Sequence, residues 1–116
     1  MTPSAPDKPD FVIVGCGKVG TSYARYLHLA GYPAAAMVSR SRASAERAAA
    51  LSGAPRWGTD PAAHTGRAEL VLITTPDGQI EPTCRQIAEG GGFVRGSVVL
   101  HCSGELPSTI LAAARE

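Results

Sequence analysis

The sequence has few aromatic residues and no long hydrophobic run. Its aromatic side chains are two Phe, one Trp and three Tyr, so a core has to be built mainly from Val, Leu, Ile and Ala. No run of about 18 apolar residues occurs, which argues against a transmembrane helix. An excess of one charge is also lacking, because 11 Lys and Arg stand against 10 Asp and Glu. We therefore expect neither nucleic acid nor a membrane as the main partner.

Signals for metal binding and for secretion are lacking as well. The three cysteines, Cys16, Cys84 and Cys102, lie far apart, and no CxxC or Cys/His ligand spacing occurs. We therefore expect no metal site and no disulfide framework, but free thiols in a cytoplasmic protein. Residues 1–9 carry three prolines instead of an apolar segment, which argues against a signal peptide and predicts a disordered leader.

Short apolar runs and helical patterns alternate along the chain. Buried strands are predicted at residues 11–14, 34–38, 70–74 and 97–101, with a weaker one at 56–57. Helices are predicted at residues 18–30, from Ser41 or Ser44 to 51, at 79–89 and from 107 onward, with a brief helical segment near 60–64. This alternation predicts an α/β fold, a Rossmann-type doubly wound parallel sheet in a single three-layer domain over residues 10–116.

The first predicted helix carries a pattern of apolar residues that suggests its buried face. The residues expected to face the core recur at helical spacing: Val19, Tyr23, Leu27 and Ala30. The side chains of His28 and His64 are expected on the surface.

A glycine-rich turn follows the first predicted strand and opens the first helix. It matches the G-x-G-x-x-G pattern, in the context that gives this pattern meaning, with the residues Gly15-Cys16-Gly17-Lys18-Val19-Gly20. Gly15 would make the tight turn, Gly17 would let a pyrophosphate approach the backbone, and Gly20 would let the helix pack closely on the strand. The first-turn amides and the helix dipole would hold the phosphates. The alternative is that the glycines serve only tight strand–helix packing.

The loop after the second predicted strand indicates which dinucleotide is bound. NAD-binding domains place an acid there for the ribose hydroxyls, whereas this loop reads Ser39-Arg40-Ser41-Arg42. The first carboxylate that follows is Glu46, inside the next predicted helix. Arginine offers a charged, planar fork to a 2′-phosphate, and serine hydroxyls add donors, so we expect NADP. The lack of an acid also disfavours S-adenosylmethionine. The alternative is that the arginines form a solvated basic turn.

Two polar loops follow the later strands at the edge of the sheet where ligands of open α/β sheets bind. The first, Thr74-Thr75-Pro76-Asp77, is expected to run beside the cofactor's ribose and nicotinamide, with Gln79 and Ile80 following it. Asp77 is alternatively an ordinary helix cap. In the second loop, His101 and Ser103 are weak candidates for contacting a substrate, and a strand-end histidine and a turn-forming serine are the alternatives. No catalytic residue is assigned.

With these segments placed, a family resemblance can be stated. The glycine turn, the Ser-Arg-Ser-Arg loop, the Thr-Thr-Pro-Asp loop and the segment His101-Cys102-Ser103-Gly104 are typical of one group of proteins. The chain resembles the N-terminal Rossmann-like NADP-binding domain of two-domain reductases similar to pyrroline-5-carboxylate reductase, ketopantoate reductase and the β-hydroxyacid dehydrogenases. The resemblance covers about residues 10–116.

This resemblance implies hydride transfer between NADPH and a carbonyl or imine of a small substrate. In such families a helical C-terminal domain, absent here, closes the active site and often makes a homodimer. We therefore expect cofactor binding but little turnover from this chain alone, and the substrate and oligomeric state stay open. A nucleotide-sensing or protein-interaction module without catalysis is the alternative function.

Overall fold

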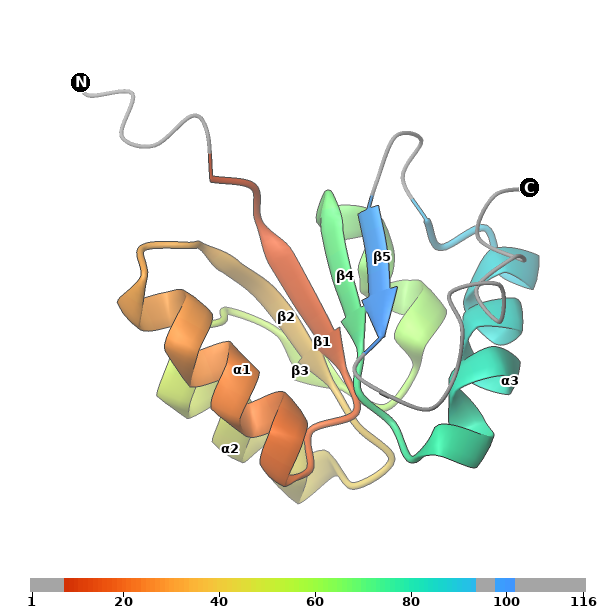
Figure 1. The fold of residues 1–116 in the computed structure, drawn as a ribbon, viewed down its shortest axis with the longest axis horizontal. Coiled ribbons are helices and arrows are strands. Elements are labelled where there is room, and N and C mark those ends of the chain that lie inside the picture. The colour runs from red at the N-terminus through yellow and green to blue at the C-terminus, as the bar shows by residue number, and fades with distance from the viewer. Residues whose placement is uncertain (1–7, 94–97, 102–116) are drawn as a thin grey trace.

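The computed structural model describes residues 8–93 and 98–101, which form a parallel sheet with helices on both faces (Figure 1). The strands are β1 (Phe11–Val14), β2 (Ala34–Val38), β3 (Trp57–Gly58), β4 (Leu70–Ile73) and β5 (Val98–His101). The helices are α1 (Lys18–Leu29), α2 (Arg42–Ser52) and α3 (Asp77–Glu89), with two 3₁₀ turns at Pro61–Ala63 and Thr65–Arg67. All strand pairs are parallel, in the order β3-β2-β1-β4-β5. The predicted Rossmann-type α/β fold is confirmed.

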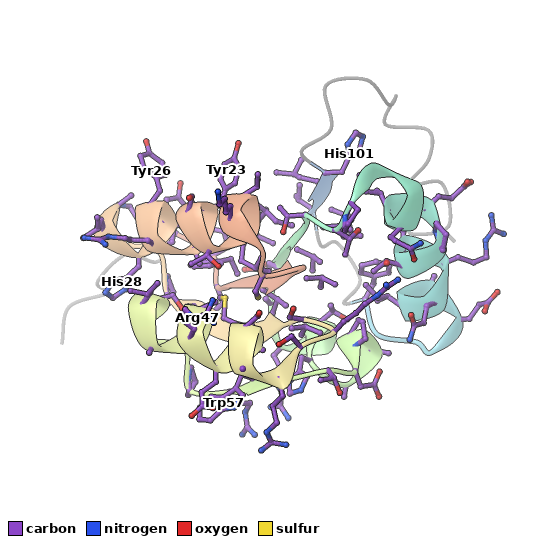
Figure 2. The ribbon with its side chains drawn as sticks, turned by 90° about the horizontal axis from the view of Figure 1, so that it is seen from below. Tyr23, Tyr26, His28, Arg47, Trp57 and His101 are labelled. Carbon is purple, nitrogen blue, oxygen red and sulfur yellow. The ribbon has the colours of Figure 1, made fainter. Side chains whose placement is uncertain are left out.

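The two faces of the sheet bury separate cores because successive side chains of a strand point in opposite directions. Phe11 and Ile13 of β1 join the core beneath α1 and α2, which contact one another (Figure 2). Val12 and Val14 face the other side and pack with α3, through Ile80 among others. Covering both faces explains why the strands read as continuous apolar runs.

The buried face of α1 differs in part from the predicted one: Leu27 packs against the core as expected, whereas Val19 and Tyr23 do not. Gly20 and Ala24 are buried, whereas Val19 is 52% exposed and Tyr23 is 41% exposed. Figure 2 shows that Tyr23 and Tyr26 both project away from the body of the domain. The reason is steric: the small residues let the helix lie close to β1, and this close approach sets which side of the helix faces the sheet. Val19 and Tyr23 on the same helix are then turned outward.

Several element boundaries differ slightly from the predicted ones. Helix α3 begins two residues earlier than predicted, at Asp77, and the third strand is Trp57–Gly58 rather than 56–57. The brief helix near residues 60–64 is a pair of 3₁₀ turns. The last predicted helix, from residue 107, lies outside the described residues, as does most of the predicted leader. Within the described residues, no helix is long and apolar enough to cross a membrane.

Candidate functional site

A cleft of about 690 Å³ opens at the carboxyl ends of β1, β2 and β4. The chain runs outward from β1 to β2 and β3, and then returns to place β4 on the other side of β1, so the strand order reverses at this point. Open α/β sheets bind their ligands at such a reversal. Twelve residues singled out from the sequence line the cleft: Gly15, Cys16, Gly17, Lys18, Val19, Ser39, Arg40, Thr74, Thr75, Pro76, Gln79 and Ile80.

The three glycines of the turn have different physical roles. Gly15 has a φ of +106°, and a Cβ added there would lie 2.7 Å from the backbone nitrogen of Thr75. A Cβ at Gly20 would overlap the carbonyl oxygen of Gly15. These two glycines are therefore required by local packing, as the alternative account proposed. Gly17 is not, because no atom lies within 4 Å of a Cβ built at that position.

The amino-terminal end of α1 presents its backbone amides without a protein cap. Gly17 occupies the N-cap position with no side-chain cap, and no acidic residue lies in the first turn. The first intrahelical bond recorded at this end runs from the amide of Thr21 to the carbonyl of Gly17, 2.9 Å away. The earlier amides have no acceptor within the helix, and the helix dipole makes their surroundings favourable for an anion.

The basic loop after β2 is divided between the cleft and the following helix. Ser39 and Arg40 line the cleft, whereas Ser41 is the N-cap of α2 and its hydroxyl accepts a bond from the amide of Ser44. Arg42 is the first residue of α2 and is exposed. Of the two arginines, only Arg40 is therefore among the lining residues. Its Nη2 atom donates a hydrogen bond to Oε1 of Gln79, 2.7 Å away and 39 residues further along the chain.

The loop after β4 is joined to the glycine turn. The hydroxyl of Thr74 donates to the carbonyl oxygen of Gly15 at 2.5 Å, so this residue holds two cleft-forming loops together. The Oγ1 atom of Thr75 is buried and has no hydrogen-bond partner among the described residues. Pro76 holds the N-cap position of α3. The alternative that Asp77 is the helix cap is therefore wrong, because Asp77 is the first residue inside the helix.

A polar face of α3 also lines the cleft, and the sequence interpretation largely missed it. Gln79, Thr83 and Gln86 recur at helical spacing along this face. Thr59 and Pro61, just after β3, also line the cleft. The helical spacing of these uncharged polar residues could have indicated a face that lines a site. A polar face of a helix is, however, usually interpreted as facing solvent.

The remaining residues considered from the sequence either do not line the cleft or carry a side chain that is unreactive at neutral pH. The thiol of Cys16 is buried and donates to the carbonyl of Val38, and burial raises its pKa to about 11, so it is protonated at neutral pH. Neither Cys16 nor Cys84 belongs to a disulfide in the described part of the chain. His101 ends β5, half-buried, and is not among the cleft-lining residues. Ser103 and Cys102 lie outside the described residues. No cluster of metal ligands occurs in the part of the chain that is described.

His64 is half-buried rather than fully on the surface as expected. Its Nδ1 atom is buried without a hydrogen-bond partner in the described residues, and a Cβ added at Gly58 would lie 2.7 Å from its Nε2 atom. Burial lowers the pKa of this imidazole, and the charges of Arg67 and Arg56 lower it further, against an opposing effect of Asp60. The folded chain therefore favours neutral His64.

This environment predicts a pH dependence of stability. Because the pKa of His64 is lower in the folded state than its ordinary value of 6.5, the unfolded chain binds the proton more readily. The stability that neutral His64 contributes to the folded state is therefore present above pH 6.5 and is lost as the pH falls below this value. Urea unfolding at pH 7 and pH 5 should show a smaller acid-induced loss for His64→Gln than for the wild type. Identical losses would contradict this assignment.

The fold and the position of the cleft at the strand-order reversal define a domain of the Rossmann class. The chain belongs to the Rossmann-like domain family, whose model matches residues 5–116. The predicted resemblance to a Rossmann-like domain is therefore confirmed, and the same fold occurs in dehydrogenases and reductases of solved structure. A comparison with curated proteins gives no match.

Solved structures with the same fold come from several oxidoreductases. A candidate NADP oxidoreductase from Bacteroides fragilis has a TM-score of 0.76 and 25% identity, over 86% of this chain and 38% of that one. Arogenate dehydrogenase from Synechocystis has a TM-score of 0.76 and 22% identity, over 91% and 37%. An imine reductase from Myxococcus stipitatus, in complex with NAD+, has a TM-score of 0.70 and 18% identity, over 87% and 34%. This chain therefore spans just over a third of each.

Proposed function

We propose that the chain is the NADP-binding domain of an oxidoreductase that transfers a hydride between NADPH and a carbonyl or imine of a small substrate. The observation that carries this proposal is the composition of the cleft at the strand-order reversal. One end offers open backbone at Gly17 beside uncapped amides, and the guanidinium of Arg40 lines the same cleft. The coarser assignment to NAD(P) does not depend on Arg40, whereas the choice of NADP does.

The pyrophosphate would be held by the main chain of the glycine turn. The open space beside Gly17 is a cradle that a Cβ would begin to fill, and packing gives no other reason for a glycine there. Amides at the start of α1 would donate to the phosphate oxygens, aided by the helix dipole. Lys18, Val19 and Cys16 line this part of the cleft and complete its surface.

The 2′-phosphate would be held by Arg40 and Ser39. Arg40 is exposed and lines the cleft, and its guanidinium can form charge-assisted bonds to phosphate. No carboxylate occupies this strand end to accept from ribose hydroxyls, as an NAD site would require. Ser41 and Arg42 lie at the start of α2, next in the chain, and we retain them as secondary contacts. Their roles in helix capping and surface charge are independent of the ligand.

The nicotinamide ring, when bound, supplies the hydride; the residues of this chain bind and orient the cofactor. The loop from Thr74 to Asp77 would contact the cofactor from the β4 side, where Thr75 has a buried hydroxyl without a partner in the described residues. His101 and Ser103 stay proposed substrate contacts at the end of β5. Turnover also requires groups that exclude water from the nicotinamide and orient the substrate, so we propose that the role of this cleft is to bind and orient the cofactor.

Calorimetric titration of the chain with NADPH, NADH and S-adenosylmethionine tests the proposal. We expect NADPH to bind about tenfold or more tightly than NADH, because one charge-assisted contact to phosphate contributes about 1.5–3 kcal/mol. S-Adenosylmethionine, which has no pyrophosphate, should not bind measurably. Equal affinities for the two dinucleotides would overturn the choice of NADP, and binding of S-adenosylmethionine alone would overturn the oxidoreductase assignment.

A further inference from the structure

The only side-chain hydrogen bond recorded between the β2 exit and α3, among the described residues, joins Arg40 to Gln79. Both residues line the cleft, one from the loop after β2 and the other from the first turn of α3. The donor–acceptor distance between Nη2 of Arg40 and Oε1 of Gln79 is 2.7 Å, which is short for a bond between exposed side chains. The bond therefore links two walls of the proposed cofactor site.

Gln79 is well placed to hold another side chain because its own position is restrained. The backbone N–H of Gln79 donates to the backbone carbonyl of Pro76 at 2.7 Å. The next residue, Ile80, is buried in the core between α3 and the sheet. Arg40, in contrast, is exposed on a loop. A long arginine side chain on a loop loses considerable rotamer freedom when it binds a ligand. A restrained partner that orients it beforehand reduces that loss.

The chemistry of the partner also matters. A guanidinium has five N–H donors, and the bond to Gln79 uses one of them. The side-chain amide of glutamine is neutral, so its oxygen orients Arg40 and leaves the positive charge in place. A glutamate at this position would neutralise that charge. The remaining donors and the whole positive charge stay available for an anion.

We propose that Gln79 is a positioning residue for cofactor selection, which orients the guanidinium of Arg40 across the cleft toward the 2′-phosphate of NADPH. The inference rests on the proposed function and deepens it, because it assigns part of the preference for NADP to a residue that need not touch the phosphate. If this inference holds, the preference for NADP over NAD depends on the hydrogen-bonded pair of Arg40 and Gln79. Otherwise the preference depends on Arg40 alone.

Two variants of Gln79 test this inference by their effect on the ratio of the two affinities. Gln79→Met keeps the side-chain length and removes the acceptor, and we expect NADPH to bind about fivefold more weakly because Arg40 must then be ordered by the ligand. Gln79→Glu introduces a carboxylate that pairs with Arg40 and repels the phosphate, so the loss should reach about 30-fold. Affinity for NADH should change less than about twofold in either variant, because NADH lacks the 2′-phosphate.

The control is Glu89→Met, which places the same residue type on the same helix at an exposed position that is not among the cleft-lining residues and has no recorded bond to Arg40. It should leave the ratio of NADPH to NADH affinity as in the wild type. Adenosine 2′,5′-bisphosphate and 5′-AMP, titrated in parallel, restrict the comparison to the half of the ligand that carries the extra phosphate. They should reproduce the same ratios, and circular dichroism would verify that each variant is folded.

Each outcome decides the question. Tighter NADPH binding by Gln79→Met would overturn the inference, because Gln79 would then compete with the phosphate for Arg40. Equal weakening for both dinucleotides, or none for either, would also overturn it. A wild-type chain that does not prefer NADPH would instead overturn the proposed choice of NADP, and the inference with it. The ratio measured on the wild type therefore separates failure of the proposed function from failure of the positioning role.

Discussion

Replacing Arg40 by aspartate is expected to weaken NADPH binding by about 100-fold, because a charge-assisted contact is lost and a carboxylate then faces the phosphate. Affinity for NADH should be retained or increased, since an acid at the end of the second strand can accept from the ribose hydroxyls. The exposed position of Arg40 means that the substitution leaves the core untouched. Calorimetric titration with both dinucleotides measures the two effects separately.

Arg47→Asp provides the matched control for this experiment. Arg47 belongs to α2 (Figure 2). It is exposed and is not among the residues that line the cleft. The same change of charge there should alter NADPH affinity only through long-range electrostatics, by about twofold or less at physiological salt. If Arg40→Asp and Arg47→Asp weakened NADPH equally, or if Arg40→Asp weakened both dinucleotides equally, the assignment of Arg40 to the 2′-phosphate would be refuted.

Replacing Gly20 by alanine should destabilise the fold itself. The added Cβ would overlap the carbonyl oxygen of Gly15 and lie 2.6 Å from the hydroxyl of Thr74, and neither group is the end of a flexible side chain. Helix α1 would have to move away from β1, and such overpacking costs about 3 kcal/mol of the free energy of unfolding. Urea unfolding, followed by circular dichroism, measures this loss directly.

Gly17→Ala separates the structural glycine from the proposed ligand-binding one. Its Cβ would enter open space, so we expect a loss of less than about 1 kcal/mol, arising from the weaker preference for alanine at an N-cap. Affinity for NADPH and NADH should nevertheless fall together, by about tenfold or more, because the Cβ enters the space proposed for the pyrophosphate. Unchanged binding of both dinucleotides would show that the pyrophosphate does not lie against Gly17.

Much of the fold could be predicted because the responsible signals are local. The strands β1 and β4 are continuous apolar runs, and each is followed by glycine or proline and then by a helical pattern. Parallel strands need long crossovers, so alternation of this kind leaves few topologies. The position of the glycine turn and the basic loop at one edge of the sheet followed from the same reasoning.

The buried face of α1 could not be predicted in this way. Its larger apolar residues, Val19 and Tyr23, lie at helical spacing and suggested a core-facing side. The side that packs on the sheet carries Gly20 and Ala24 next to the correctly predicted Leu27, because close approach to β1 near the start of the helix excludes larger side chains. A periodicity argument weighs hydrophobicity and does not include this steric limit.

The order of elements and the types of residue that end the strands were determined by the sequence alone. These features are hydrophobic runs, glycines at turns and the lack of an acid after β2. Each depends only on residues that are close together in the sequence. Only the tertiary structure decided which of those residues meet: it separated Arg40 from Arg42, distinguished Gly17 from Gly15 and Gly20, and joined Arg40 to Gln79 across 39 residues. Such pairings depend on how packed elements place their ends in space, and no local pattern encodes that geometry.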